Sequence, residues 1–93
     1  MERVVKITVC LFGSLRTVAG LSSILIEEEE GTNIQNLFVE LCKMYPELSK
    51  TLFSKHRTDL ILVNGVEIGN LDGLFTCLSI DSTVTLLPVV HGG

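Results

Sequence analysis

The sequence predicts an α+β fold in which a mixed sheet of about five strands packs against one main helix. Two runs of alternating apolar and polar residues open the chain, a stretch with helical spacing of its apolar residues follows, and a β-rich run comes just before the C-terminus. With 93 residues, the chain is long enough for one domain, which is predicted to span 1–93.

The two N-terminal runs predict a β-hairpin with strands at 4–12 and 21–28. In the second strand, Ile24 and Ile26 would face the core. Residues 13–20 begin and end with glycine and are expected to form the connecting loop. In the first strand, the residues that would face the core are Val5, Ile7, Val9 and Leu11.

Four consecutive acidic residues, 27–30, close the second predicted strand. Such a run is more often the solvated end of a strand than a binding site. The alternative is a charged face that contacts a basic partner. The sequence leaves both interpretations open.

The clearest helical pattern follows this run. Thr32 is the candidate N-cap, and Gln35 stands at the spacing of a capping box. Pro46 is expected to end the helix, and a short second helix is predicted over 47–54, with Leu48, Leu52 and Phe53 turned inward. The apolar stripe of the main helix consists of Ile34, Leu37, Phe38, Leu41, Cys42 and Tyr45.

A second hairpin is predicted in the C-terminal half. Strands at 59–63 and 66–68 flank Asn64-Gly65, the strongest short hairpin signal because both residues tolerate positive φ. Residues 69–81 are expected to form a loop.

The last strand is predicted over 83–87, with Val84 and Leu86 facing the core. Pro88 should end its ladder, because proline has no N–H to donate. An opening hairpin, one amphipathic helix across it and a closing central strand describe a β-grasp, or ubiquitin-like, sheet, in which the first and last strands lie parallel and side by side.

Composition argues against nucleic-acid binding and against membrane association. The net charge is −4 and the few basic residues are scattered, which disfavours nucleic acid as a partner. We see no apolar run long enough to span a membrane and no signal-peptide pattern, so we expect a cytoplasmic protein that does not bind membranes.

Cysteines and histidines give no sign of a metal site. The three cysteines are widely spaced without a C-x-x-C motif, and His56 and His91 have no evident ligands around them. The cysteines stand in apolar contexts and are expected to be small buried hydrophobic residues: Cys10, Cys42 and Cys77.

The chain ends in a tail, 88–93, that adds little to a core. Gly92 and Gly93 have no side chains and cost entropy to order. They would suit a partner that threads the last residues through a narrow channel to reach the Gly93 carboxylate. Val89, Val90 and His91 would then form the stem, whereas the simpler alternative is a frayed end.

Four segments carry a resemblance to a known family. They are LFGSLR at 11–16, LVNG at 62–65, LDGLFTCL at 71–78 and VTLLPVVHGG at 84–93. Together they resemble the MoaD family, the small subunit of molybdopterin synthase, within the MoaD/ThiS-type ubiquitin-like sulfur carriers. His91 departs from that pattern, which more usually has a small residue there.

The resemblance implies a chemistry in which Gly93 is the reacting residue. A MoeB-like adenylating enzyme of the ubiquitin-activating type would use ATP to adenylate the Gly93 carboxylate, and a sulfur donor would convert it to a thiocarboxylate. A MoaE-like large subunit would then pass the sulfur to cyclic pyranopterin monophosphate. The small protein itself would bind no cofactor and no metal. Relatives in the thiamine pathway and relatives that modify proteins share this ending.

Two groups of side chains are candidate partner contacts. Pro88, Val89, Val90, His91 and Gly92 would enter the partner with Gly93. Leu74 and Phe75 stand in the predicted loop, where an exposed aromatic residue would be a typical anchor in a partner's pocket. The alternative for Phe75 is that it caps the core.

Overall fold

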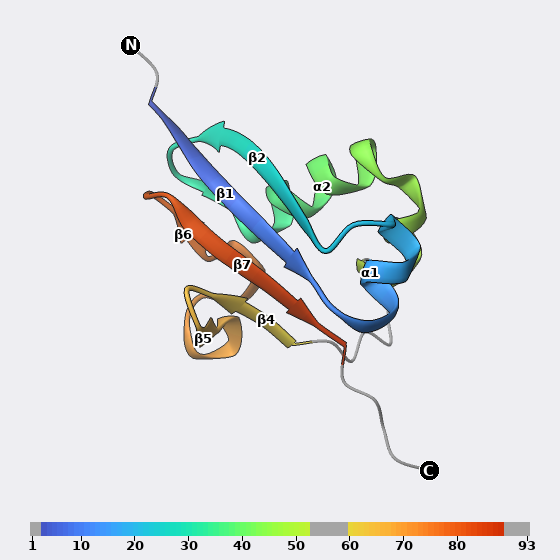
Figure 1. The fold of residues 1–93 in the computed structure, drawn as a ribbon. Helices are drawn as coiled ribbons and strands as arrows, with labels where there is room; N and C mark the ends of the chain where they lie inside the picture. The colour runs from blue at the N-terminus through green and yellow to red at the C-terminus, as the bar shows by residue number, and fades with distance from the viewer. Residues whose placement is uncertain (1–2, 53–59, 89–93) are drawn as a thin grey trace.

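The structure is a computed structural model that describes residues 3–52 and 60–88. Its main feature is a five-stranded mixed sheet with the order β2-β1-β7-β4-β5 (Figure 1). β1 and β7 are parallel and the other neighbours are antiparallel, as predicted for a β-grasp sheet. The strands are β1 (Val4–Leu11), β2 (Ser23–Glu29), β4 (Leu60–Val63), β5 (Val66–Glu67) and β7 (Ser82–Leu87).

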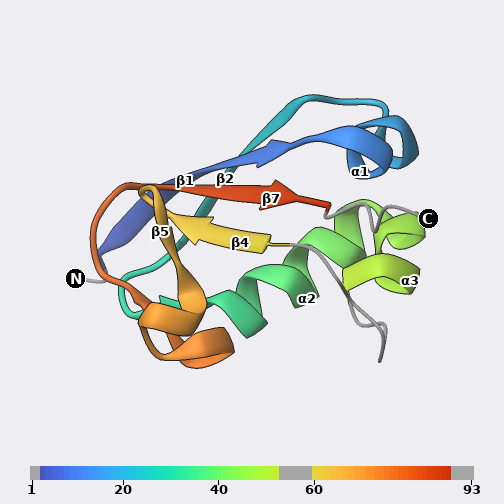
Figure 2. The same cartoon turned by 90° about the horizontal axis from the view of Figure 1, so that it is seen from below.

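One face of the sheet packs against α2 (Ile34–Met44), the predicted main helix. Figure 2 shows α2 and the short α3 (Ser49–Leu52) on the same side of the sheet. The predicted core residues of β1, β2 and β7 are buried together with the stripe of α2, because each element presents one apolar face. The residues of α2 in this core are Ile34, Leu37, Phe38 and Leu41.

The expected loop at 13–20 was wrong, because this segment is the helix α1 (Gly13–Ala19). Only Leu15 of this helix is buried, so its sequence lacks the repeated apolar spacing by which a helix is recognised. The helix ends at Gly20, which adopts a left-handed conformation and donates its N–H to the Arg16 carbonyl over 2.9 Å.

The N-cap of α2 is Asn33, so the prediction of Thr32 was wrong by one residue. The Asn33 Oδ1 accepts the N–H of Asn36 over 2.8 Å. Thr32 instead belongs to β3 (Thr32–Asn33), which pairs with β6 (Cys77–Leu78) in a small second sheet. Asn33 also pairs in β3 and still caps the helix, in keeping with the stronger capping preference of asparagine than of threonine.

The chain after α2 turns through a 3-10 helix, Pro46–Leu48, into α3. Leu48 and Leu52 are buried, as predicted for the second helix. Phe53 and the remainder of the segment predicted at 47–54 lie outside the described residues, as does position 59 of the next predicted strand.

The predicted Asn64-Gly65 hairpin joins β4 to β5, with φ values of 49° and 86° at the two turn residues. Ile68 does not extend β5 but opens a 3-10 helix, Ile68–Asn70. The predicted loop at 69–81 holds a second 3-10 helix, Gly73–Phe75, and the strand β6.

The cysteines are less buried than the sequence suggested. Cys10 and Cys42 are half-buried, and Cys42 packs against the core. Cys77 is exposed, so its predicted burial was wrong. The two residues of β6 point in opposite directions, and Leu78 takes the inward position.

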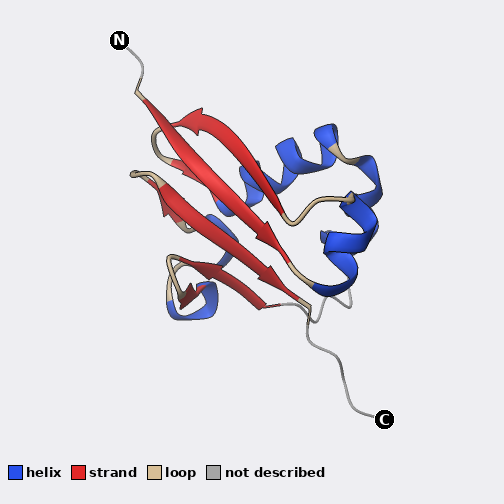
Figure 3. Cartoon of the chain, viewed as in Figure 1, coloured by secondary structure: helices blue, strands red, loops and turns tan. Residues whose placement is uncertain are grey.

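The open face of the sheet is the one turned away from α2 and α3. In Figure 3 the strands lie in front of these helices, and no described helix covers the front face. None of the helices described is long and apolar enough to cross a membrane.

Candidate functional site

The candidate site is the root of the C-terminal tail, which we define as Phe12, Gly13, Leu60, Leu87 and Pro88. β7 leads to it between two neighbours: Leu11 of β1 pairs with Leu86, and Leu60 of β4 pairs with Leu87. The Phe12 N–H donates to the Leu86 carbonyl over 3.3 Å. The last strand is therefore held from both sides up to the residue before Pro88.

Pro88 follows directly after the last strand residue, as predicted from its missing N–H. An ideal Cβ at Gly13 would lie 3.3 Å from the Cγ of Pro88, so the proline ring sits close against the glycine backbone. Gly13 has φ +58°, a conformation that residues with a Cβ rarely adopt. Gly13 thus serves the tail root in two ways: it turns the chain into α1 and leaves room for Pro88.

The tail root is apolar and partly accessible. Phe12 is 44% exposed and Leu60 is 42% exposed, while Leu87 and Pro88 are half-buried. All five residues are uncharged. Such a surface suits contact with an apolar rim around a channel.

From the sequence, Pro88 was predicted to begin the tail and position 87 to end the last strand, whereas Phe12, Gly13 and Leu60 were not assigned to this site. The signal was present in part, because Phe12 and Gly13 follow the first strand directly and the first and last strands were expected to be parallel. In a parallel pair, the ends of both strands meet at the same edge of the sheet. The position of Leu60 required the register of β4.

The other predicted tail residues lie outside the described residues. They are Val89, Val90, His91, Gly92 and Gly93. Their roles therefore stay predictions, and the structure contributes the position from which the tail starts.

The second predicted contact, Leu74 and Phe75, is separate from the tail root. Both residues belong to the 3-10 helix that lies beside β5, away from the C-terminal end of β7 in Figures 1 and 2. Leu74 packs against the core, whereas Phe75 is 68% exposed. Phe75 therefore does not cap the core, and the structure favours the exposed alternative.

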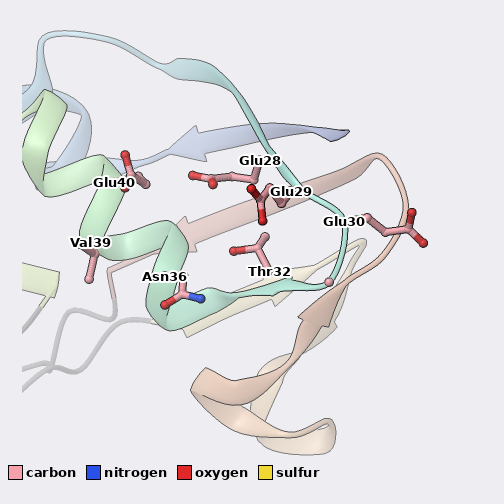
Figure 4. A pocket seen from close by; sticks show the side chains of 8 residues that line it. Glu28, Glu29, Glu30, Thr32, Asn36, Val39 and Glu40 are labelled. Atoms are coloured by element: carbon pink, nitrogen blue, oxygen red, sulfur yellow. The ribbon is translucent and has the colours of Figure 1, made fainter. Parts of the chain in front are cut away.

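A charged groove lies between β2 and α2. Its lining includes Glu28, Glu29, Glu30 and Glu40, and Figure 4 shows Glu28 and Glu40 directed toward one another. Burial raises the pKa of Glu28 above its ordinary value, Glu40 and Glu29 raise it further, and Lys43 opposes them. Within residues 3–52 and 60–88 we find no group of three or more His, Cys, Asp or Glu residues that could hold a metal ion.

Comparison with protein families is decisive for the class of this chain. Residues 9–93 match the model of the ThiS family. The chain belongs to the ThiS family. The match covers the tail root, the second hairpin and the terminal Gly-Gly. A search of curated proteins finds no significant match.

Solved structures place this ThiS-family chain among ubiquitin-like carriers and modifiers. Small archaeal modifier protein 1 of Methanosarcina acetivorans is 27% identical, with a TM-score of 0.79 over 98% of this chain and 99% of that one. Urm1 of Trypanosoma brucei is 26% identical, with a TM-score of 0.72 over the full length of both. A putative molybdopterin converting factor subunit 1 from Pyrococcus furiosus is 24% identical, with a TM-score of 0.77 over 92% and 99%.

Some structures that share this fold contain a partner protein. One is the BexX/CysO complex of Amycolatopsis orientalis, matched at 24% identity with a TM-score of 0.74 over 94% of this chain and 99% of that one. The complex of subunits 1 and 2 of the molybdopterin-converting factor of Helicobacter pylori 26695 matches at 22% identity with a TM-score of 0.60 over 95% and 99%. At these identities the likeness concerns the fold.

Proposed function

We propose that this ThiS-family chain is the sulfur-carrier small subunit of a molybdopterin synthase, and that its reacting group is the carboxylate of Gly93. The observation that carries the proposal is the tail root. The strand that leads to the terminal Gly-Gly is the central strand of the sheet, and it ends against Gly13 in an uncharged, half-exposed surface. A carrier needs such a fixed starting point, because a partner must find the C-terminus in the same place each time.

The reaction starts at a group that is unreactive by itself. The α-carboxylate has an ordinary pKa of about 3.3–3.7 and is ionised at neutral pH. Its oxygen attacks the α-phosphorus of ATP, and pyrophosphate leaves. A sulfur nucleophile then attacks the Gly93 carbonyl carbon, a C–S bond replaces the C–O bond, and AMP leaves. When the nucleophile is a persulfide, a thiol reductant must cleave the acyl disulfide to release the thiocarboxylate.

Two partners follow from this chemistry. A MoeB-like adenylating enzyme would supply ATP and hold the tail, and a MoaE-like large subunit would receive the sulfur for cyclic pyranopterin monophosphate. We place these reactions in the cytoplasm. The uncharged tail root would contact both partners, and Phe75 is a second candidate contact on a separate surface. The chain itself would bind no cofactor, since ATP belongs to the activating enzyme.

Mass spectrometry tests the proposal directly. The intact chain, incubated with a MoeB-like enzyme, ATP and a sulfur source, should gain about 16 Da as sulfur replaces oxygen. Addition of a MoaE-like subunit and cyclic pyranopterin monophosphate should return the original mass and yield molybdopterin. A thiocarboxylate that forms but is not discharged by this large subunit would support a carrier for another pathway, such as thiamine synthesis.

A second candidate is a ubiquitin-like protein modifier that is conjugated through Gly93 to lysine side chains. The observation that favours it is sequence identity: the modifier from Methanosarcina acetivorans and Urm1, at 27% and 26%, are somewhat more similar than the converting-factor subunit at 24%. Incubation of the tagged chain in extract of its own cells should then yield lysine-linked, high-mass adducts. Their absence, together with discharge to the pterin, would exclude this candidate.

A further inference from the structure

The edge of the sheet formed by β2 has no described strand beside it. Two hydrogen bonds fix which residues of this segment face β1: Leu11 N–H to the Ser22 carbonyl and Glu30 N–H to the Arg3 carbonyl, both 2.9 Å. In an antiparallel ladder, residues two apart share a direction, so Ile24, Ile26 and Glu28 also turn their backbone groups toward β1.

The alternate residues of β2, which include Leu25 and Glu27, turn their backbone groups away from β1. The N–H and C=O groups of Leu25 and Glu27 therefore point outward from the sheet, where another strand could pair with them. Leu25 is 65% exposed, and its side chain, like that of Glu27, stands on the open face of the sheet. This edge offers the two elements of strand addition, namely unpaired backbone groups and an apolar side-chain contact.

The space beside this edge is an open groove of about 440 Å³ between β2 and α2. Glu28 of β2 and Glu40 of α2 line it from the two elements, and Figure 4 shows two uncharged polar side chains beside them, Thr32 and Asn36. Val39, which is half-exposed, adds a small apolar surface from the helix. A strand added to β2 would run along this groove.

The negative charges of the groove favour a partner with basic side chains. Four acidic side chains line the groove: Glu28, Glu29, Glu30 and Glu40. Two of them have a basic neighbour: Lys43 Nζ lies 3.2 Å from Glu40, and Arg3 lies 3.9 Å from Glu30. Both contacts are at the surface and contribute little. Burial raises the pKa of Glu28, and Glu40 and Glu29 raise it further against the opposing charge of Lys43, which agrees with an excess of negative charge in the groove.

We propose that the β2 edge binds an extended basic segment of a partner protein, which adds to the sheet as a sixth strand. Backbone hydrogen bonds would form to Leu25 and Glu27. Lys or Arg side chains on alternate residues would face the acidic groove, which Glu28 and Glu40 line, and the apolar side chains between them would contact Leu25 on the open face. Of the two interpretations of the acidic run 27–30, this one makes use of the strand edge beside it.

The same charges oppose the simplest competing occupant, a second copy of this chain. Two β2 edges paired with each other would bring the acidic runs close together, and like charges at paired positions are unfavourable. The proposal is also independent of the tail reaction, because β1 separates β2 from β7. Failure of one proposal therefore leaves the other untouched.

Nuclear magnetic resonance of the full-length, ¹⁵N-labelled chain with an eight-residue peptide of alternating Lys and Val tests the proposal. The peptide should slow hydrogen exchange at the amides of Leu25 and Glu27, whereas Ile24 and Ile26, already paired with β1, should change much less. Glu29→Lys should weaken binding by about fivefold. Glu47→Lys, which makes the same charge change at an exposed site outside the groove, should leave it within about twofold.

Matched peptides separate strand addition from charge attraction. A peptide with Glu in place of Lys should not bind, and one with every backbone amide N-methylated should lose the protection of Leu25 and Glu27. Equal binding of the N-methylated peptide, or shifts spread over all acidic residues without slower exchange on β2, would show non-specific attraction and overturn the proposal. Equal effects of Glu29→Lys and Glu47→Lys would overturn it too.

Discussion

The tail root and the β2 edge differ in how much of their backbone is paired and in the charge of their side chains. At the tail root, β7 has a neighbour on each side and the surrounding side chains are uncharged. At the β2 edge, the backbone groups of one side have no neighbouring strand and the side chains are acidic. The tail root is thus fixed in place and electrically neutral, whereas the edge is open and selective by charge.

This difference suggests a division of labour. A reacting C-terminus must be delivered with the same geometry to every partner, so its base benefits from strands on both sides. A docking edge needs free backbone groups and discriminates partners by charge. Substitutions at the two regions should therefore affect different measurements.

Deletion of Gly93 should have the largest effect on chemistry and almost none on folding. The deletion moves the terminal carboxylate back by one residue, away from the position at which it is adenylated. Thiocarboxylate formation in the mass assay should therefore fall below detection. Gly93 has no side chain to pack, and the free energy of unfolding should change by less than about 0.5 kcal/mol. Thermal denaturation of both proteins measures this. A large loss of stability, or a normal gain of mass, would contradict the assignment.

Gly13→Ala should destabilise the tail root more than Gly20→Ala destabilises the end of α1. Both glycines have positive φ, which costs about 1–2 kcal/mol for a residue with a Cβ. Only Gly13 also has a neighbour, the Pro88 ring at 3.3 Å, whereas nothing lies within 4 Å of a Cβ at Gly20. We therefore expect about 1 kcal/mol more loss for Gly13→Ala in urea denaturation. Equal losses would show that Pro88 moves aside freely.

Leu60→Asp and Leu25→Asp compare the two regions in the activation reaction. Both side chains are exposed enough to tolerate substitution, at 42% and 65%. A carboxylate beside Leu87 would be desolvated against the activating enzyme, so Leu60→Asp should raise the KM of that enzyme for this chain by about tenfold. Leu25→Asp adds the same charge at the β2 edge and should leave the KM unchanged. If both raise it equally, the tail root has no special role in docking.

The sequence predicted the regular parts of this molecule well. Alternation identified the inward residues of β1, β2 and β7, and Asn64-Gly65 predicted its hairpin, because one period or one turn signal determines each of these features. The helix α1 was missed because only one of its residues is buried. The N-cap was misplaced because the prediction followed the capping-box spacing of Thr32 and Gln35, whereas the neighbouring Asn33, a stronger capping residue than threonine, accepts the N–H of Asn36.

The candidate site could likewise be predicted only where a local property of the sequence determines it. Pro88 could be assigned from its own chemistry, since a residue without an N–H ends a ladder. Phe12, Gly13 and Leu60 could not be assigned to the tail root, because their role depends on which strands lie beside β7 and in what register. The β2 edge likewise required the strand order, since residues 27–30 alone favoured a solvated strand end over a binding face.

The smallest expected effect concerns Glu28 and depends on pH. Its pKa is raised by burial first, then by Glu40 and Glu29, against the opposing charge of Lys43. A carboxyl whose pKa is higher in the folded state destabilises the fold when ionised. The free energy of unfolding should therefore rise as pH falls through the folded pKa, and the gain ends below the unfolded value.

Glu28→Gln should remove this penalty. The variant should be more stable than the parent at pH 7 by less than about 0.5 kcal/mol, and the difference should vanish below the ordinary pKa of glutamate. Glu47→Gln removes one negative charge at an exposed position outside the groove, and urea denaturation of both variants across pH 4 to 7 shows whether the gain is specific to Glu28. A gain that is equal in both, or independent of pH, would mean that the acidic groove carries no local repulsion. The β2 edge would then lose its electrostatic distinction from the tail root, because its charges would be screened as thoroughly as any others on the surface.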